Sequence, residues 1–215
     1  MEPGGRGRHP QAEFNLAKAN QLLEAAGWTK GADGIRAKGR VKLKFVFQTS
    51  VSGPRQKTQA IIKDACGKAG IELELKGVVA SVYFGGDTAN PDTLDKFWAD
   101  MQMLNTAMTQ PDPQNFMEQF TTENLAQKAN KWSGRNFPRW SNADYDAAFK
   151  ASQTELDAVK RAAVFIKMND LLASDGHVIA LSNRPRSHGV ANKLVPALSS
   201  WDGTTWALGY WYREA

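Results

Sequence analysis

The sequence contains little cysteine and little histidine, with one Cys and three His among its 215 residues. A single thiol cannot form an internal disulfide. A Cys-rich zinc module is also excluded, because structural zinc needs four ligands and the chain offers one Cys and three scattered His. No apolar run approaches the length of a membrane-spanning helix. The first residues are not expected to be a signal peptide, because no apolar stretch follows Arg6 and Arg8.

The chain also lacks the common catalytic motifs. It has no Gly-rich phosphate loop after a strand and no GxSxG sequence around a nucleophilic serine. His9, His177 and His188 lie far apart in the sequence, so surface or structural roles are expected for them. Cys66 falls on the apolar side of an expected helix, where an inert, buried thiol is usual. We therefore predict no catalytic residue, no metal site and no cofactor.

What is present describes an ordinary globular chain, with 42% hydrophobic and 23% charged residues. The formal net charge of +5 is uneven, because residues 1–76 hold 14 Lys and Arg against 7 Asp and Glu. Such asymmetry can indicate a nucleic-acid-binding module. Here the basic residues alternate with strand and helix patterns, and no nucleic-acid-binding motif accompanies them. We therefore expect no nucleic acid partner.

The first half of the chain alternates helix and strand patterns. Apolar residues recur at helical spacing after Asn15, a favoured N-cap type, and predict a helix that stops at Gly27. Turn-rich residues follow, and then alternating apolar and charged residues predict strands over 41–47 and 71–75. Between them an amphipathic helix ending near Gly70 is expected, with an apolar stripe of Thr58, Ile61, Ile62, Ala65, Cys66 and Ala69.

Strand, helix and strand in this order predict a βαβ unit with parallel strands. If the two strands are neighbours, oppositely charged side chains share one face of the sheet: Lys42 and Lys44 with Glu72 and Glu74.

The second half is mainly helical. We expect a short helix or loop over 80–96, a strand over 100–104 and a loop through Thr109. Asp112 is then expected to cap a helix that continues through Phe120. A turn-rich aromatic stretch over 128–140 precedes two helices and a final strand, over 142–155, 158–173 and 177–181, with Asn142 and Asp157 as the helix caps. The order of elements predicts the α/β class.

Several segments occur in a specific order between Asn15 and Leu181: AKANQLLEAAGW, RQKTQAIIKDACGKAGIELEL, the DPQNF helix opening, RWSNADYDA and DAVKRAAVFIKMNDLLASDGHVIAL. Together they resemble the extracytoplasmic solute-binding proteins of family 5, the dipeptide- and oligopeptide-type receptors of ABC importers. The resemblance implies a periplasmic binding protein-like lobe with a βαβ core and additional helices.

Members of that family are longer and consist of two lobes that close on a ligand. The first residues contain Gly, Arg and Pro without periodicity, so a disordered leader is expected over 1–14. The resemblance implies the C-terminal lobe over 15–185 and a tail over 186–215 that would pack on the missing first lobe. Without that lobe, the tail's aromatic side chains would be exposed and favour self-association: Trp201, Trp206 and Trp211.

The resemblance also implies a function. The chain would be one lobe of the substrate-binding component of a periplasmic ABC importer for a small peptide or another polar solute, and not an enzyme. Its partners would be the importer's membrane permease and the missing N-terminal lobe. The alternatives are a basic nucleic-acid-binding or protein-interaction module and a truncated fragment without a function.

Ligand contacts are implied around the loop before Pro113. In peptide-binding members an aspartate four residues before this proline pairs with the ligand's α-amine, and an aromatic residue commonly precedes it by three. Those positions are Thr109 and Thr106, and a threonine cannot neutralise an ammonium, which argues against a free-amine peptide. The expected contacts are Thr106, Ala107, Met108 and Thr109, then Trp132, Arg135 and Trp140, with core packing an equally open role for the tryptophans.

Overall fold

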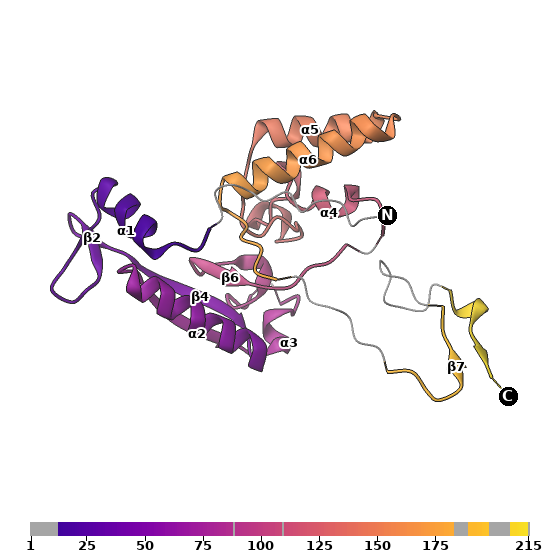
Figure 1. Ribbon diagram of the computed structural model, residues 1–215, viewed down its shortest axis with the longest axis horizontal. Coiled ribbons are helices and arrows are strands. Elements are labelled where there is room, and N and C mark those ends of the chain that lie inside the picture. Colours follow the sequence, from indigo (N-terminus) through magenta and orange to yellow (C-terminus); the bar gives the residue numbers. More distant parts are fainter. Residues whose placement is uncertain (1–12, 88, 109, 183–188, 198–206, 215) are drawn as a thin grey trace. The chain divides into compact units, whose positions relative to one another are not determined.

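The computed structural model (Figure 1) describes residues 13–87, 89–108, 110–182, 189–197 and 207–214. The chain divides into two compact units. The first consists of Met1–Asn105 and Glu123–Arg139, and the second of Thr106–Thr122 and Trp140–Ala215. The expected leader lies outside the described residues, apart from its last two.

The first unit contains a three-stranded parallel sheet in the order β5 (Glu72–Val78), β4 (Lys44–Ser50), β6 (Met101–Met103). Helix α2 (Gly53–Lys68) connects β4 to β5, which confirms the predicted βαβ unit and the α/β class. Lys44 and Glu72 are register partners on these strands, and the Lys44 ammonium lies 2.8 Å from the Glu72 carboxylate, as predicted for neighbouring strands. Lys42 instead pairs with Asp33, at 2.5 Å, because it belongs to a different sheet.

Helix α2 covers one face of this sheet (Figure 1). Ile62 and Cys66 pack against the core formed by Phe47, Leu73 and Met103. Ile61 is 71% exposed, so its place on the apolar stripe was predicted wrongly. Gln59, one turn before Ile62, is buried instead. Its side-chain amide donates to the Phe47 carbonyl at 2.7 Å, so the buried polar group has a partner.

The N-terminal part adds helix α1 (Leu16–Ala25) and an antiparallel sheet of β1 (Thr29–Lys30), β2 (Arg36–Lys38) and β3 (Val41–Lys42). Asn15 caps α1 by accepting from the Lys18 amide at 2.9 Å, and Gly27 follows the helix with φ +84°, as predicted. The sheet places β1 and β2 where turns alone were predicted. It also divides the predicted strand 41–47, since Val41–Lys42 pairs with β2 and only Lys44 onward pairs with β5.

The rest of the first unit consists of short elements. Helix α3 (Ala80–Tyr83) and the 3₁₀ turn η1 (Leu94–Lys96) follow β5, in agreement with the predicted short helix or loop. Their core contains Val78, Tyr83 and Leu94. The turns η2 (Thr122–Asn124) and η3 (Lys128–Asn130) belong to the turn-rich region before Trp140.

The second unit is built on α4 (Gln114–Glu118), α5 (Ala143–Thr154) and α6 (Ala158–Ser174). Its core includes Met117, Trp140, Tyr145, Phe165 and Met168. The predicted caps Asn142 and Asp157 are confirmed. Helix α4 is shorter than predicted and has Pro113 at its N-cap, although the Asp112 carboxylate still accepts from the Gln114 amide at 2.9 Å.

The predicted strand over 177–181 is wrong. These residues have no strand partner in the described chain, and Ile179 and Leu181 are 70% and 52% exposed. An apolar run becomes a strand only when another strand satisfies its backbone groups. The described tail instead pairs β7 (Leu194–Val195) with β8 (Tyr212–Arg213), next to the turn η4 (Leu208–Tyr210). No helix of the described part is long and apolar enough to cross a membrane.

Candidate ligand-binding site

The topology of the parallel sheet indicates where a ligand would bind. From the central strand β4 the chain passes to β5 on one side and then to β6 on the other. In open α/β sheets ligands bind outside the carboxyl ends of the strands, where the connections diverge to opposite sides. Here that point is the edge formed by Val51, which follows β4, and by Leu104 and Asn105, which follow β6.

The predicted loop leaves the sheet at this edge. Asn105 ends the first unit and Thr106 begins the second. Thr106 and Ala107 are exposed, Met108 is half-buried, and none of the three is in a helix or strand. Thr109 lies outside the described residues. The loop therefore offers short polar and apolar side chains to solvent.

Asp112 is engaged in holding the protein together. Its carboxylate receives two hydrogen bonds from the Arg161 guanidinium, at 2.7 and 3.1 Å, in addition to the one from the Gln114 amide. The bonds from Arg161 and then from Gln114 lower the pKa of Asp112. This arrangement favours the predicted structural role over ligand contact.

Two side chains at the carboxyl edge were not singled out in the sequence. The Arg55 guanidinium, in the first turn of α2, contacts the buried Ser50 hydroxyl and lies 5.4 Å from the centre of the Phe84 ring. Phe84 is 51% exposed. The sequence did contain a signal that could have identified Arg55. It is an arginine shortly after a strand, at the start of the following helix, where α/β proteins commonly place ligand contacts.

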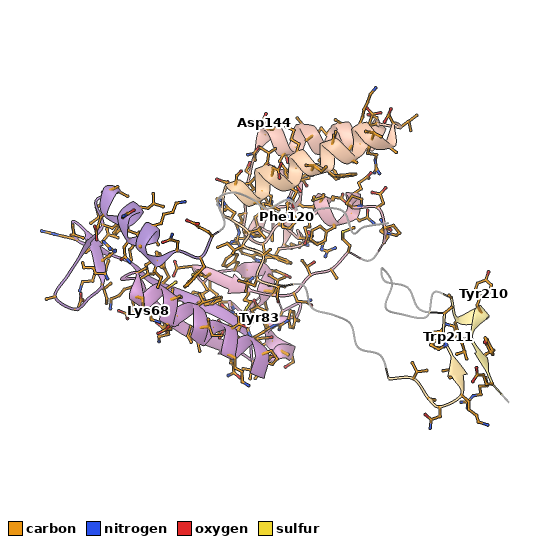
Figure 2. All side chains as sticks on the ribbon, viewed as in Figure 1. Lys68, Tyr83, Phe120, Asp144, Tyr210 and Trp211 are labelled. Atoms are coloured by element: carbon orange, nitrogen blue, oxygen red, sulfur yellow. The ribbon has the colours of Figure 1, made fainter. Side chains whose placement is uncertain are left out.

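Tyr83 stabilises this edge of the sheet through a buried hydrogen bond. The hydroxyl of Tyr83, which is labelled in Figure 2, donates to the Met103 carbonyl at 3.0 Å and so attaches α3 to the end of β6. The side chain is fully buried, and burial raises the pKa of the phenol. Tyr83 thus remains a neutral hydrogen-bond donor and fixes the position of the neighbouring Phe84.

Two cations of the first unit lie over the Trp132 ring. The ring centre is 5.3 Å from the Arg139 guanidinium and 5.9 Å from the Lys96 ammonium. The ring is half-buried, and Lys131 and Trp132 both have positive φ, at +56° and +64°. Such backbone conformations are costly for residues with side chains and persist only where surrounding contacts hold them.

Arg139 supplies several of those contacts. Its guanidinium donates to the Ala126 carbonyl at 2.8 Å and also to the carbonyls of Asp95, Lys96 and Phe97. Partial burial lowers its pKa, and these carbonyls compensate for the lost hydration. Arg139 therefore binds the 95–97 segment to the loop that carries Trp132.

The remaining predicted contacts differ in burial. Arg135, in the first unit, is exposed and forms no ion pair with a described residue. Trp140, in the second unit, is 2% exposed, and its indole N–H donates to the Asp175 carboxylate. Its ring also packs edge-on against Tyr145, 5.0 Å between centres, which favours the core-packing interpretation for Trp140.

Metal or catalytic chemistry has little support in the described residues. They contain no group of three or more His, Cys, Asp or Glu side chains that could hold a metal ion. His177 lies 3.1 Å from the exposed carboxylate of Asp175, while His9 and His188 are outside the described residues. Cys66 is a half-buried free thiol whose pKa is raised by burial, which agrees with the inert role predicted for it.

Comparison with known proteins gives a consistent result. The family model described as bacterial extracellular solute-binding proteins, family 5 Middle, matches residues 2–128. No curated protein matches the chain.

Solved structures share the fold at low sequence identity. An oligopeptide-binding protein from Thermus thermophilus, complexed with a pentapeptide, is 23% identical with a TM-score of 0.68, over 80% of this chain and 30% of that one. AppA from Bacillus subtilis, in complex with a nonapeptide, is 19% identical with a TM-score of 0.67, over 94% and 38%. NikZ from Campylobacter jejuni, in complex with Ni(L-His), is 18% identical with a TM-score of 0.64, over 77% and 31%. The chain thus spans about a third of the length of these proteins.

Proposed function

This chain belongs to family 5 of the bacterial extracellular solute-binding proteins, and from that premise we propose that it supplies one lobe of the substrate-binding component of an ABC importer. The observation that carries the proposal is the family match over residues 2–128. A solute-binding lobe works by presenting one half of a ligand site, and the other lobe encloses the ligand when the two close. The partners proposed are a complementary N-terminal lobe and a membrane permease. The place proposed for the binding component is outside the cytoplasm.

The ligand contacts proposed are given for each part of the chain by itself. They are the loop Thr106, Ala107, Met108 and Thr109, the pair Arg55 and Phe84, and, from the turn-rich region, Trp132 and Arg135. Trp140 is left out because it is buried. These side chains offer an aromatic face, hydroxyl groups and a guanidinium, which suit a polar solute with flat or apolar parts.

The nature of the solute is proposed from this chain's own residues. The similar proteins carry ligands as different as a nonapeptide and Ni(L-His), so the fold alone does not select a substrate. Thr109 offers a hydroxyl but no negative charge to a ligand amine. We infer a small peptide whose amine is blocked, or another polar solute, and no catalytic role.

Calorimetric titration of the purified chain tests this proposal. A thermal melt first establishes cooperative folding, and di- and tripeptides, their N-acetylated forms and short oligosaccharides are then titrated. The chain alone is expected to melt cooperatively and to bind none of them with micromolar affinity, because one lobe supplies only part of the contacts. Addition of the complementary lobe, once identified, is expected to restore binding, with N-acetylated peptides preferred over free-amine ones. Micromolar binding by the chain alone would contradict the one-lobe interpretation.

The nucleic-acid alternative is weakened by the placement of the basic residues. Lys42, Lys44 and Lys68 pair with neighbouring carboxylates, and Arg36 is buried beside Glu24. A cation already paired with a carboxylate has less to gain from a phosphate. The excess of positive charge in residues 1–76 is therefore partly neutralised within the fold.

A further inference from the structure

A row of three polar side chains crosses the sheet of the first unit. Lys76 on β5, Gln48 on β4 and Gln102 on β6 are register partners. Successive residues of a strand point to opposite faces, and Phe47 packs in the core that includes Ile62 and Cys66 of α2. The row therefore lies on the face of the sheet away from α2.

All three side chains bind the same segment of chain. The Gln48 amide donates to the Asp92 carbonyl at 2.9 Å, and the Gln102 amide donates to the Leu94 carbonyl at 2.9 Å. The Lys76 ammonium donates to the Asp92 carboxylate at 2.6 Å. The segment Asp92–Leu94 is thereby attached across three strands.

Two acceptors of this row have no hydrogen-bond partner among the described residues. Gln48 Oε1 and Gln102 Oε1 are both buried, and no described group donates a hydrogen bond to either. If either side-chain amide were flipped by 180°, its oxygen would face the Asp92 or Leu94 carbonyl oxygen, and the hydrogen bond that its nitrogen donates would be lost. Gln48 and Gln102 are register partners on neighbouring strands, which lie about 4.8 Å apart, so their side chains extend side by side from the same face of the sheet.

We propose that Gln48 and Gln102 form a buried hydration site, in which one water molecule donates a hydrogen to each amide oxygen. A water carries two hydrogens, which matches two acceptors that each lack a donor, and buried water typically bridges such groups. A hard divalent cation fits poorly, because it takes about six oxygen ligands. The proposal is independent of the transport function.

The site contributes to the support of Trp132. The water joins β4 to β6 beneath Asp92–Leu94, and the same chain continues to Phe97, whose carbonyl accepts from Arg139. Arg139 in turn lies over the Trp132 ring. A rigid sheet face thus anchors the residues that position this side chain.

A crystal structure of the whole chain at high resolution tests the proposal directly. We expect a single solvent peak about 2.7–3.2 Å from both Gln48 Oε1 and Gln102 Oε1. The proposal would be overturned if the two amides hydrogen-bond to each other or if no peak is present. It would also be overturned by a peak with the short distances and high coordination number of a cation. Thermal midpoints that are equal in sodium, potassium and choline chloride are expected, whereas a rise specific to one cation would also overturn it.

Variants provide a test in solution. We compare Gln48→Met, Gln102→Met and the double variant, with Gln56→Met on the exposed side of α2 as control. Because one water serves both oxygens, each single variant releases it. The urea midpoint of the double variant should therefore fall by less than the sum of the single losses, and the control should show no loss. Strictly additive losses would overturn the shared site, and if a variant fails to fold the crystal structure decides.

Discussion

At the scale of residues, three partly or wholly buried arginines differ in what they bind. Arg36 donates to the carbonyls of Ala69 and Trp28 and pairs with Glu24, and Arg139 donates to four carbonyls. Among the described residues, Arg55 contacts the Ser50 hydroxyl and lies over the Phe84 ring, and no carboxylate of that part lies within ion-pair distance of it. A guanidinium has five N–H donors, so Arg55 retains most of its donors for a ligand.

Gly134 is a position where any side chain is excluded by the backbone. A Cβ there would lie 2.5 Å from the carbonyl carbon of Leu125, a distance that real Cβ atoms essentially never show. We expect Gly134→Ala to lower the free energy of unfolding by about 1–3 kcal/mol, since overpacking forces the backbone to shift. Urea denaturation measures the loss. Gly86→Ala, with nothing within 4 Å of the added carbon, is the control, and equal stability of the two variants would contradict the expectation.

Asp112 should make stability depend on pH. Its pKa is lowered in the folded chain, so its contribution is present above its unfolded pKa and is lost as the pH falls through the folded value. Asp112→Asn keeps a hydrogen-bond acceptor but removes the charge facing Arg161. For this partly exposed pair we expect a loss of about 1 kcal/mol at pH 7.

The loss at Asp112→Asn should begin to shrink as the pH falls below about 4, where the carboxyl of the unfolded chain becomes protonated, and should disappear once the pH is below the lower pKa of the folded chain. Urea unfolding at several pH values between 2 and 7 follows it. Asp170→Asn, at an exposed position of α6, controls for the change of side chain. A loss at Asp112→Asn that stays constant over this range would show that the charge is not responsible.

At the scale of elements, the capping residues decide where the helices begin. The Asp157 carboxylate accepts from the amides of Val159 and Lys160, at 2.9 and 3.1 Å, at the start of α6. Asp157→Ala should cost about 1 kcal/mol of stability, because it leaves those amides without a protein acceptor. Thermal and urea unfolding measure it, and Asp157→Ser, which keeps a capping oxygen, should recover most of the loss. If serine and alanine were equivalent, capping would not explain the effect.

The sequence predicted elements whose signals are local. Asn15, Asn142 and Asp157 cap helices, and alternation over 71–75 predicted β5, because these patterns depend on residues near one another in the chain. The strand predicted over 177–181 failed because a strand also needs a partner, and local apolar character cannot supply one. The strands β1 and β2 do pair with each other, but they were missed because their turn-rich sequence shows no alternation of apolar and polar residues.

The candidate site was predictable only in part. The loop 106–108 follows β6 as the sequence indicated, and its exposure agrees with a role at the surface. The contact of Arg55 with Phe84 joins residues from two elements, and no pattern along the chain relates them. The same holds for Gln48 and Gln102, which are neighbours only through the β4–β6 register.

At the scale of the whole molecule, the length of the chain governs what it can do. It spans about a third of the similar solved proteins, and its parallel sheet has three strands. Each proposed ligand contact is therefore one part of a larger set. The proposed function therefore predicts weak binding by the chain alone and tight binding by a complete assembly, because binding energy accumulates only when several contacts form together.

Self-association is the behaviour expected of the isolated chain. The described tail exposes Leu208, Tyr210 and Tyr212, at 57%, 80% and 58%, whereas Trp211 is half-buried with its N–H directed to the Ala197 carbonyl (Figure 2). Trp201 and Trp206 lie outside the described residues. Grouped apolar exposure of this kind favours association, because contact with a second chain removes it from water.

Sedimentation velocity over a range of concentrations measures this association. We expect the average mass to rise with concentration, and the triple variant Leu208→Ser, Tyr210→Ser and Tyr212→Ser to shift the rise to higher concentration. Leu156→Ser is the matched control, since Leu156 is 96% exposed in the short connection before α6, outside the tail. If the tail provides the contact, removing this leucine should leave the association unchanged. A chain that stays monomeric at all concentrations, or a control variant that acts as strongly as the triple variant, would show that the tail does not provide the contact.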